Sequence, residues 1–99
     1  MPKYLFVYHG GAMAQTEEER NEAMAAWGRW AEEAGPAIVD FGAPIGERAV
    51  VGPDGGNPAS GYGLFTADSL DAAAELAQGC PVLARGGSVE VGEAIEIAM

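Results

Sequence analysis

The sequence is poor in the residues that bind metals and form disulfides. Its 99 residues include one cysteine, Cys80, and one histidine, His9. A single cysteine cannot form an internal disulfide, and one histidine with one cysteine supply too few ligands for the usual zinc sites. We therefore expect no metal site and no cofactor, and a lone cysteine fits a reducing compartment.

Basic residues and long apolar runs are also scarce. Acidic residues outnumber basic ones, 15 to 5, which gives a formal net charge of -10. This charge repels the phosphates of nucleic acids and the anionic headgroups of membranes. The apolar run at residues 4–8 is too short for a signal peptide or a membrane span, and His9 ends it. The sequence therefore predicts a cytoplasmic protein without nucleic-acid or membrane partners.

The length of the chain predicts a single domain, residues 1–99, because one core commonly occupies about 100 to 150 residues. A chain of this size buries only about 60–65% of its unfolded surface. Hydrophobic residues nevertheless make up 48% of the sequence. This apolar excess indicates a subunit interface, and a homo-oligomer is the simplest way to form one.

The stretch 62–82 has the clearest local pattern. An aromatic and apolar run at 61–66 predicts a buried strand. Asp68 or Ser69 then caps a helix, because either side chain can accept a hydrogen bond from a free backbone N–H. Small apolar residues recur at helical spacing until Gly79. We expect a strand followed by a short helix that packs closely on a sheet.

The N-terminal third predicts another strand and helix. Residues 4–8 are apolar on both faces, which is typical of a central strand covered above and below. Thr16 and Glu19 form a capping box, in which each side chain satisfies a backbone N–H of the other residue. The apolar stripe of the helix that follows is assigned to the core and consists of Ala23, Trp27, Trp30 and Ala34.

Three more stretches, at 37–41, 47–51 and 88–97, also predict strands, and the first two are joined by a bend. Residues 52–61 are all turn formers or small residues and predict a mobile loop. The resulting order is βαββαβ. The expected fold is α+β and ferredoxin-like, with one four-stranded antiparallel sheet and two helices on one face.

Two helices on one face leave the other face of the sheet uncovered. Because the predicted strands are apolar on both sides, we expect a second copy of the chain to cover this face. Two sheets packed about 10 Å apart would form a dimeric α/β barrel, with a cleft where the sheets do not touch.

Motifs along nearly the whole chain resemble the YCII-related proteins, in the branch that includes DGPF-like members. They are KY at 3–4, MAAW at 24–27, GAP at 42–44, ADSLDAA at 67–73, GCPV at 79–82 and GGSVEV at 86–91. The resemblance implies a homodimeric α+β barrel. Most of this family has no assigned function.

The chain departs from the YCII pattern at two positions. Some YCII-like proteins are thought to use a histidine of the first helix with an aspartate that precedes a proline near the end of the second helix. Here Met24 stands at the helix position and Cys80 precedes Pro81, so this dyad cannot be carried over. The nearest counterpart of the DGPF signature is the segment 52–55.

Two ionisable residues are candidates for catalysis. His9 ends the first strand at a loop edge, where functional side chains often project, and the alternative is a solvent-facing strand end. Asp40 lies in an otherwise apolar strand and is either a hydrogen-bonded carboxylate facing a cleft or a charge at a solvated edge. Together they would form a general base and the group that orients it.

Tyr8 and Tyr62 are candidate ligand-binding residues beside these two. Polar groups in or beside apolar strands have to be compensated, and a bound ligand can do so. We therefore predict a small-molecule-binding homodimer. The alternative is an enzyme of the lyase, isomerase or hydrolase type, which acts on a small aromatic or enol substrate with His9 as general acid or base.

Overall fold

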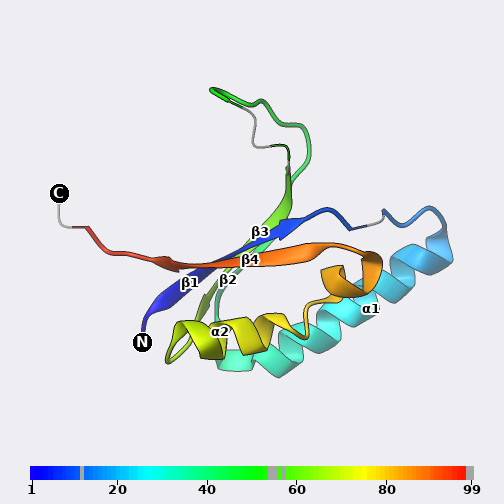
Figure 1. Cartoon of the computed structure of the whole chain (residues 1–99). Helices are drawn as coiled ribbons and strands as arrows, with labels where there is room; N and C mark the ends of the chain where they lie inside the picture. Colours follow the sequence, from blue (N-terminus) through cyan, green and yellow to red (C-terminus); the bar gives the residue numbers. More distant parts are fainter. Residues whose placement is uncertain (12, 54–55, 57, 98–99) are drawn as a thin grey trace.

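The chain forms one antiparallel sheet with both helices on one side (Figure 1). The computed structural model describes residues 1–11, 13–53, 56 and 58–97. In chain order the elements are β1 (Lys3–His9), α1 (Glu17–Ala34), the 3-10 helix η1 (Gly35–Ala37), β2 (Ile38–Pro44), β3 (Ala59–Thr66), α2 (Leu70–Ala77), the 3-10 helix η2 (Pro81–Arg85) and β4 (Ser88–Ala94). This order confirms the predicted α+β, ferredoxin-like βαββαβ fold.

The strands lie in the order β2-β3-β1-β4, and each neighbouring pair is antiparallel. β1 and β3 therefore occupy the centre of the sheet, as their sequences predict. In this register Leu5 of β1 lies opposite Leu64 of β3 and Gly92 of β4. Residues opposite one another point to the same face of a sheet, so the register also defines which side chains share the face without helices.

Both helices begin at the predicted caps. The backbone N–H of Glu19 donates to Thr16 Oγ1 at 3.0 Å. The second half of the expected capping box differs, because Glu19 Oε2 accepts from the backbone N–H of Gln15, at 2.8 Å, instead of Thr16. At the start of α2 the backbone N–H of Ala72 donates to Ser69 Oγ at 3.1 Å, so Ser69 is the cap.

The predicted strand at 47–51 is wrong. β2 ends at Pro44, and the chain then leaves the sheet and projects on the side opposite the helices (Figure 1). An apolar, β-prone sequence forms a strand only beside a hydrogen-bonded neighbour, and Val51 is instead 97% exposed. The last strand also stops early, at Ala94, short of the predicted end at Ile97.

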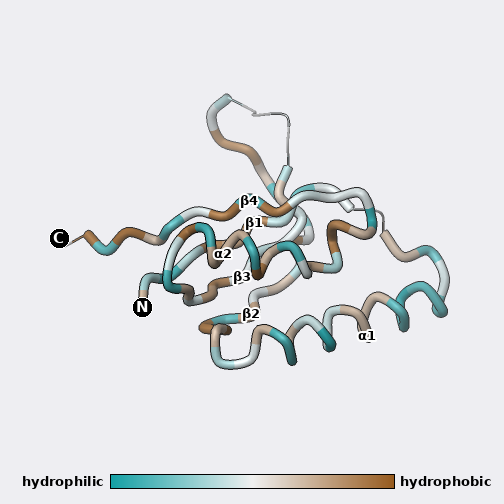
Figure 2. Tube along the Cα trace, turned by 60° about the horizontal axis from the view of Figure 1, so that its bottom comes forward, coloured by the Kyte–Doolittle hydropathy of each residue, from teal (hydrophilic) through white to brown (hydrophobic). Residues whose placement is uncertain are grey.

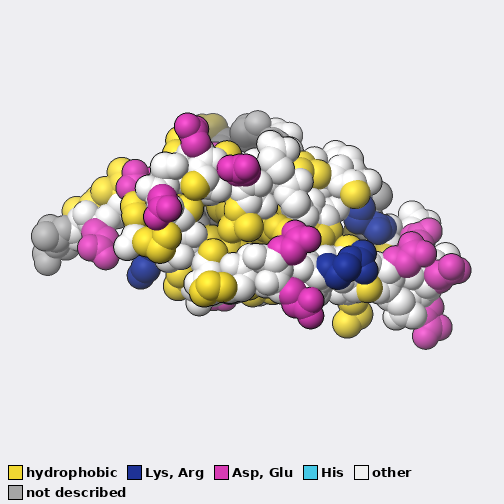
Figure 3. Space-filling model, turned by 90° about the horizontal axis from the view of Figure 1, so that it is seen from below, with side chains coloured by type: hydrophobic (Ala, Val, Ile, Leu, Met, Phe, Trp, Pro, Cys, Tyr) yellow, Lys and Arg dark blue, Asp and Glu magenta, His cyan; other side chains and the backbone are white. Residues whose placement is uncertain are grey.

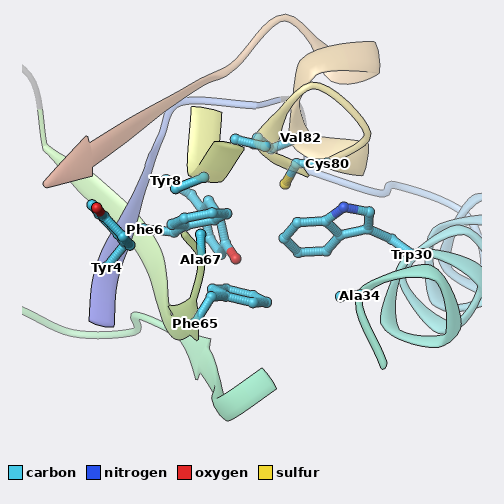
Figure 4. Close-up of a cluster of buried hydrophobic side chains, with 11 residues drawn as sticks. Tyr4, Phe6, Tyr8, Trp30, Ala34, Phe65, Ala67, Cys80 and Val82 are labelled. Atoms are coloured by element: carbon cyan, nitrogen blue, oxygen red, sulfur yellow. The ribbon is translucent and has the colours of Figure 1, made fainter. Parts of the chain in front are cut away.

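The core lies between the sheet and the helices. Trp30 reaches from α1 toward Phe6 and Phe65 of the sheet (Figure 4), and its ring centroid lies 5.2 Å from that of Phe65. Its indole Nε1–H donates to the carbonyl oxygen of Leu76 at 3.1 Å, which links α1 to α2. Aromatic packing and one partly buried hydrogen bond therefore fix the position of α1 over the sheet.

Hydrophilic and hydrophobic positions alternate along α1 (Figure 2). In the predicted stripe Trp30 and Ala34 are buried, whereas Ala23 and Trp27 are only half-buried. The C-terminal half of α1 therefore covers the core, and its N-terminal half borders open space. Neither α1 nor any other helix in the described part of the chain is long and apolar enough to cross a membrane.

Candidate functional site

A cleft lies between the N-terminal half of α1 and the part of the sheet formed by β2 and β3. Its volume is about 510 Å³, and we call it the aromatic cleft. Its largest lining residues are Tyr8, Met24, Trp27, Phe41, Tyr62 and Val82. An apolar lining and a volume in this range are typical of small-molecule sites.

Tyr8 brings a buried polar group to the aromatic cleft. β1 directs this side chain to the helix side of the sheet, where its ring meets Trp27 edge to face at 5.3 Å. Among the described residues, the Tyr8 hydroxyl is a buried side-chain oxygen without a hydrogen-bond partner. Leaving such a group unsatisfied costs about 1–3 kcal/mol. The hydroxyl is therefore the group in the cleft that gains most from a ligand.

The environment of Tyr8 keeps its hydroxyl protonated. Burial, and to a smaller degree the nearby Cys80 thiol, raises the pKa of Tyr8 well above its ordinary value. A neutral phenol has one proton to donate and lone pairs to accept. At any physiological pH this group is thus a neutral hydrogen-bond donor.

Two glycines let β2 and β3 approach closely under the cleft. Gly42 has a φ of +77°, and a β-carbon at this position would overlap the carbonyl oxygen of Tyr62. A β-carbon at Gly63 would lie 3.1 Å from the Tyr8 hydroxyl. Asp40 secures the irregular part of β2, because its Oδ1 accepts from the backbone N–H of Gly42 at 2.9 Å. These residues shape the cleft floor, and Asp40 has a structural hydrogen bond of its own.

His9 lies on the other face of the sheet, beside a carboxylate that the sequence did not single out. Its Nε2 lies 3.0 Å from Glu90 Oε1. The side chain of His9 is 11% exposed and that of Glu90 is 72% exposed. His9 pairs with Ser88 in the β1–β4 register, so Glu90 is its diagonal neighbour on the same face. An imidazole beside a carboxylate is the arrangement of a general base and its orienting group.

The register separates His9 from Asp40. Asp40 lies opposite Leu64 of β3, which lies opposite Leu5 of β1, and β3 stands between β1 and β2. By standard strand geometry this puts His9 and Asp40 about 13 Å apart along the strands and about 10 Å apart across them. Within one chain His9 is therefore paired with Glu90 and not with Asp40.

A second cavity, of about 830 Å³, lies on the other flank of α1, between this helix and η2. Seen from the helix side, hydrophobic side chains are visible in the hollow between the helical segments (Figure 3). Its rim is charged and includes Glu22, Arg29, Glu33 and Arg85. Trp27 lines both cavities and so stands between them. None of the four predicted site residues is among the described residues of this second lining.

Cys80 is buried, as expected of a structural thiol. Burial raises the pKa of this thiol to about 11, although a backbone hydrogen bond from Val82 partly offsets the effect. The thiol therefore stays protonated and unreactive near neutral pH. Within the described residues, no group of three or more histidine, cysteine or carboxylate side chains is placed to hold a metal ion.

Two of the four predicted site residues border the aromatic cleft, although the β1–β3 register turns the side chain of Tyr62 toward the face without helices. Tyr8 and Tyr62 both line the aromatic cleft, whereas His9 and Asp40 are not among its described lining residues. Sequence reasoning assigned Trp27 to the core rather than to a ligand pocket, because of its helical spacing; it does pack against the core, but it also lines the cleft. The same reasoning missed Glu90, whose link to His9 depends on strand pairing between distant parts of the chain.

No family model and no curated protein matches the chain. Among solved structures, it is similar to 5-chloro-2-hydroxyhydroquinone dehydrochlorinase (TftG) from Burkholderia phenoliruptrix AC1100, in complex with 2,5-dihydroxybenzoquinone. The TM-score is 0.53 and the sequence identity is 20%, over 89% of this chain and 90% of that chain. At this identity the likeness establishes a shared fold, which agrees with the ferredoxin-like topology.

Proposed function

We propose that this chain is a YCII-related protein that binds a small ring compound in the aromatic cleft. The observation that carries the proposal is the buried, unpartnered Tyr8 hydroxyl at the wall of an apolar cleft. Aromatic walls favour a flat ring through offset or edge-to-face packing. A cleft that combines such walls with few polar groups is the usual form of a small-molecule site.

Two further observations support this class of ligand. The motif resemblance to YCII-related proteins extends along nearly the whole chain, and the fold agrees with it. The structurally similar dehydrochlorinase is in complex with 2,5-dihydroxybenzoquinone, which is also a small ring compound. The physical argument from the cleft and these similarities thus favour the same kind of molecule.

The experiment is a screen of single-ring compounds by thermal shift, followed by NMR titration of each hit. A variant that fills the cleft, Gly28→Phe, should weaken binding at least tenfold, because Gly28 lines the cleft and nothing lies within 4 Å of a β-carbon there. Ala25→Phe is the matched control, since Ala25 is also exposed on α1 but lines neither cavity. Equal affinity of both variants for the hits would place the ligand elsewhere.

We further propose that the chain is a homodimer through the sheet face without helices. Leu5 and Tyr62 are each 40% exposed on this face, although both belong to central strands. Burying apolar area of this kind contributes about 25 cal/mol per Å². A charge at the centre of the face, Leu5→Asp, should convert the dimer to a monomer in sedimentation experiments, whereas Val51→Asp, on the projecting loop, is the control. A monomeric wild type at micromolar concentration would refute this proposal.

The alternative function is enzymatic, and the His9–Glu90 hydrogen bond is the observation that favours it. A neutral His9 oriented by Glu90 would remove a proton from carbon next to a carbonyl group, giving an enolate and protonated His9, which would then return the proton. This is the proton transfer that a lyase or isomerase acting on an aromatic or enol substrate requires. In the proposed dimer the pair would lie between the two sheets.

Deuterium exchange into phenylpyruvate in D₂O, followed by NMR, tests this reading. His9→Gln should lower a protein-dependent exchange rate by about 100-fold or more, and Glu90→Gln should lower it less. Asp40→Asn is the control, because Asp40 lies two strands away and is bonded to Gly42. Exchange by the wild type at the rate of buffer alone would count against His9 as general acid or base for such substrates.

A further inference from the structure

The Tyr8 hydroxyl places a chemical requirement on any molecule that occupies the aromatic cleft. This hydroxyl is buried and has no partner among the described residues, while the ring that carries it packs against Trp27. The hydroxyl lacks both an acceptor for its proton and a donor to its oxygen, and an unsatisfied donor in an apolar site is costly. A ligand that presents an acceptor oxygen removes this cost, and one that presents only carbon leaves it.

The surroundings of the hydroxyl also select against charge. The side chains Trp27, Phe41 and Val82 of the cleft lining are apolar, so a carboxylate or phenolate would lose its hydration with one neutral donor in return. The chain itself carries a net charge of -10, which further disfavours an anion. An uncharged acceptor is therefore the better match.

Trp27 packs against the ring that carries the hydroxyl. It is half-buried and borders cavities on both flanks of α1, and its ring also contacts those of Trp30 and Phe41. A β-carbon at Gly63 would lie 3.1 Å from the hydroxyl, so the sheet backbone also lies close to it. Because the hydroxyl is buried, a ligand contacts it only when a neighbouring side chain such as that of Trp27 moves aside.

We propose that the aromatic cleft selects uncharged ring compounds that carry a carbonyl oxygen, and that Tyr8 recognises this oxygen by donating a hydrogen bond. This inference rests on the proposed function, because it assumes that the cleft binds ring compounds. It goes beyond that function by naming the ligand class and the residue that determines specificity.

The test uses two molecules of nearly the same shape. Acetophenone has a carbonyl oxygen where α-methylstyrene has a methylene group, so their difference in affinity isolates the hydrogen bond. The wild type should bind acetophenone about five- to tenfold more tightly than α-methylstyrene, as measured by NMR titration. Tyr8→Phe should bind both equally, with its α-methylstyrene affinity close to that of the wild type. Benzoate should bind the wild type more weakly than acetophenone.

The variant Tyr4→Phe is the matched control, because Tyr4 is also a buried tyrosine on the helix side of β1 but is not among the described lining residues of the cleft. It should keep the preference for acetophenone. Failure of all three probes to bind the wild type would refute ring binding itself. Binding of both neutral probes without preference, tighter binding of benzoate, or a preference that persists in Tyr8→Phe would overturn the carbonyl inference and leave ring binding in place.

Discussion

The two faces of the sheet differ in how far their apolar side chains are buried, and β1 contributes residues to both. Along β1, Phe6 is 0% exposed beneath the helices, and its neighbour Leu5 is 40% exposed on the other face. Both residues are apolar, so the difference comes from the topology, which places both helices on one side (Figure 1). The helices bury the apolar residues of one face, whereas apolar residues of the other face, such as Leu5, stay partly exposed in a single chain.

The polar groups of the two faces differ in the opposite way. On the helix side the Tyr8 hydroxyl is buried and has no partner among the described residues. On the open side the imidazole of His9 is hydrogen-bonded to Glu90. On the covered face the apolar side chains are fully packed, but the Tyr8 hydroxyl lacks a hydrogen-bond partner among the described residues. The ligand proposal therefore rests on the helix side, and the dimer proposal rests on the open side.

The largest predicted contrast is between the two neighbours Phe6 and Leu5. Phe6→Ala should lower the free energy of unfolding by about 3–5 kcal/mol, because it removes a fully buried ring from the core. Leu5→Ala should cost under about 1 kcal/mol in a monomer, since this side chain already meets water. Urea denaturation of both variants at low protein concentration measures the difference.

Protein concentration then sharpens this comparison. If the open face is a dimer interface, the cost of Leu5→Ala should grow as the concentration rises, because association stabilises only the folded state. The cost of Phe6→Ala should change much less. Similar costs for the two variants at low concentration would show that the open face is covered within a single chain.

Alkaline pH provides a second, smaller test of the covered face. Folding raises the pKa of Cys80 from 9.0 to about 11, so the folded state holds this proton more tightly than the unfolded state. The corresponding stability is fully present below about pH 9 and is lost as the pH rises toward 11. Unfolding curves of the wild type and Cys80→Ala should therefore converge across this range. Parallel pH profiles would mean that the thiol is accessible.

Local rules explain most of what the sequence predicted about the fold. Thr16 and Ser69 were identifiable as caps because an N-cap bond depends on a backbone N–H only three residues away. The strand predicted at 47–51 does not form, because β propensity reflects side-chain shape, whereas a strand also needs a hydrogen-bonded neighbouring strand. That neighbour is fixed by the whole sheet, and β2 pairs with β3 only as far as Pro44.

The site was less predictable for the same reason. Tyr8 and Tyr62 could be proposed because an aromatic hydroxyl in an apolar strand is visible in the sequence. The partner of His9 could not, because Glu90 lies 81 residues away and reaches it only through the β1–β4 register. Trp27 and Trp30 belong to the same apolar stripe of α1, and the structure is needed to show that Trp30 is buried while Trp27 is half-buried beside the cleft.

Removing a tyrosine hydroxyl from each face of the sheet gives a third comparison, of two free energies of unfolding. Tyr8→Phe should leave the free energy of unfolding unchanged or raise it by up to about 1 kcal/mol, because it deletes a buried hydroxyl without a partner. Tyr62→Phe should change it by less than about 0.5 kcal/mol, since that residue is partly exposed. Chemical denaturation of the two variants measures both values. A clear loss of stability in Tyr8→Phe would reveal a partner for the hydroxyl, such as a buried water, and would weaken the ligand argument.

The last comparison concerns Gly28, which lines the aromatic cleft from α1. A glycine within a helix costs about 0.5–1 kcal/mol relative to alanine, and at Gly28 no atom lies within 4 Å of the added methyl group. Gly28→Ala should therefore raise the melting temperature by a few degrees, because about 1 kcal/mol shifts a domain of this size by roughly 4–8 °C. The same methyl group enters the lining of the cleft, so the variant should bind ring compounds more weakly while it becomes more stable. Thermal melts with and without acetophenone measure both effects, and a gain in stability without loss of affinity would show that Gly28 does not shape the ligand site.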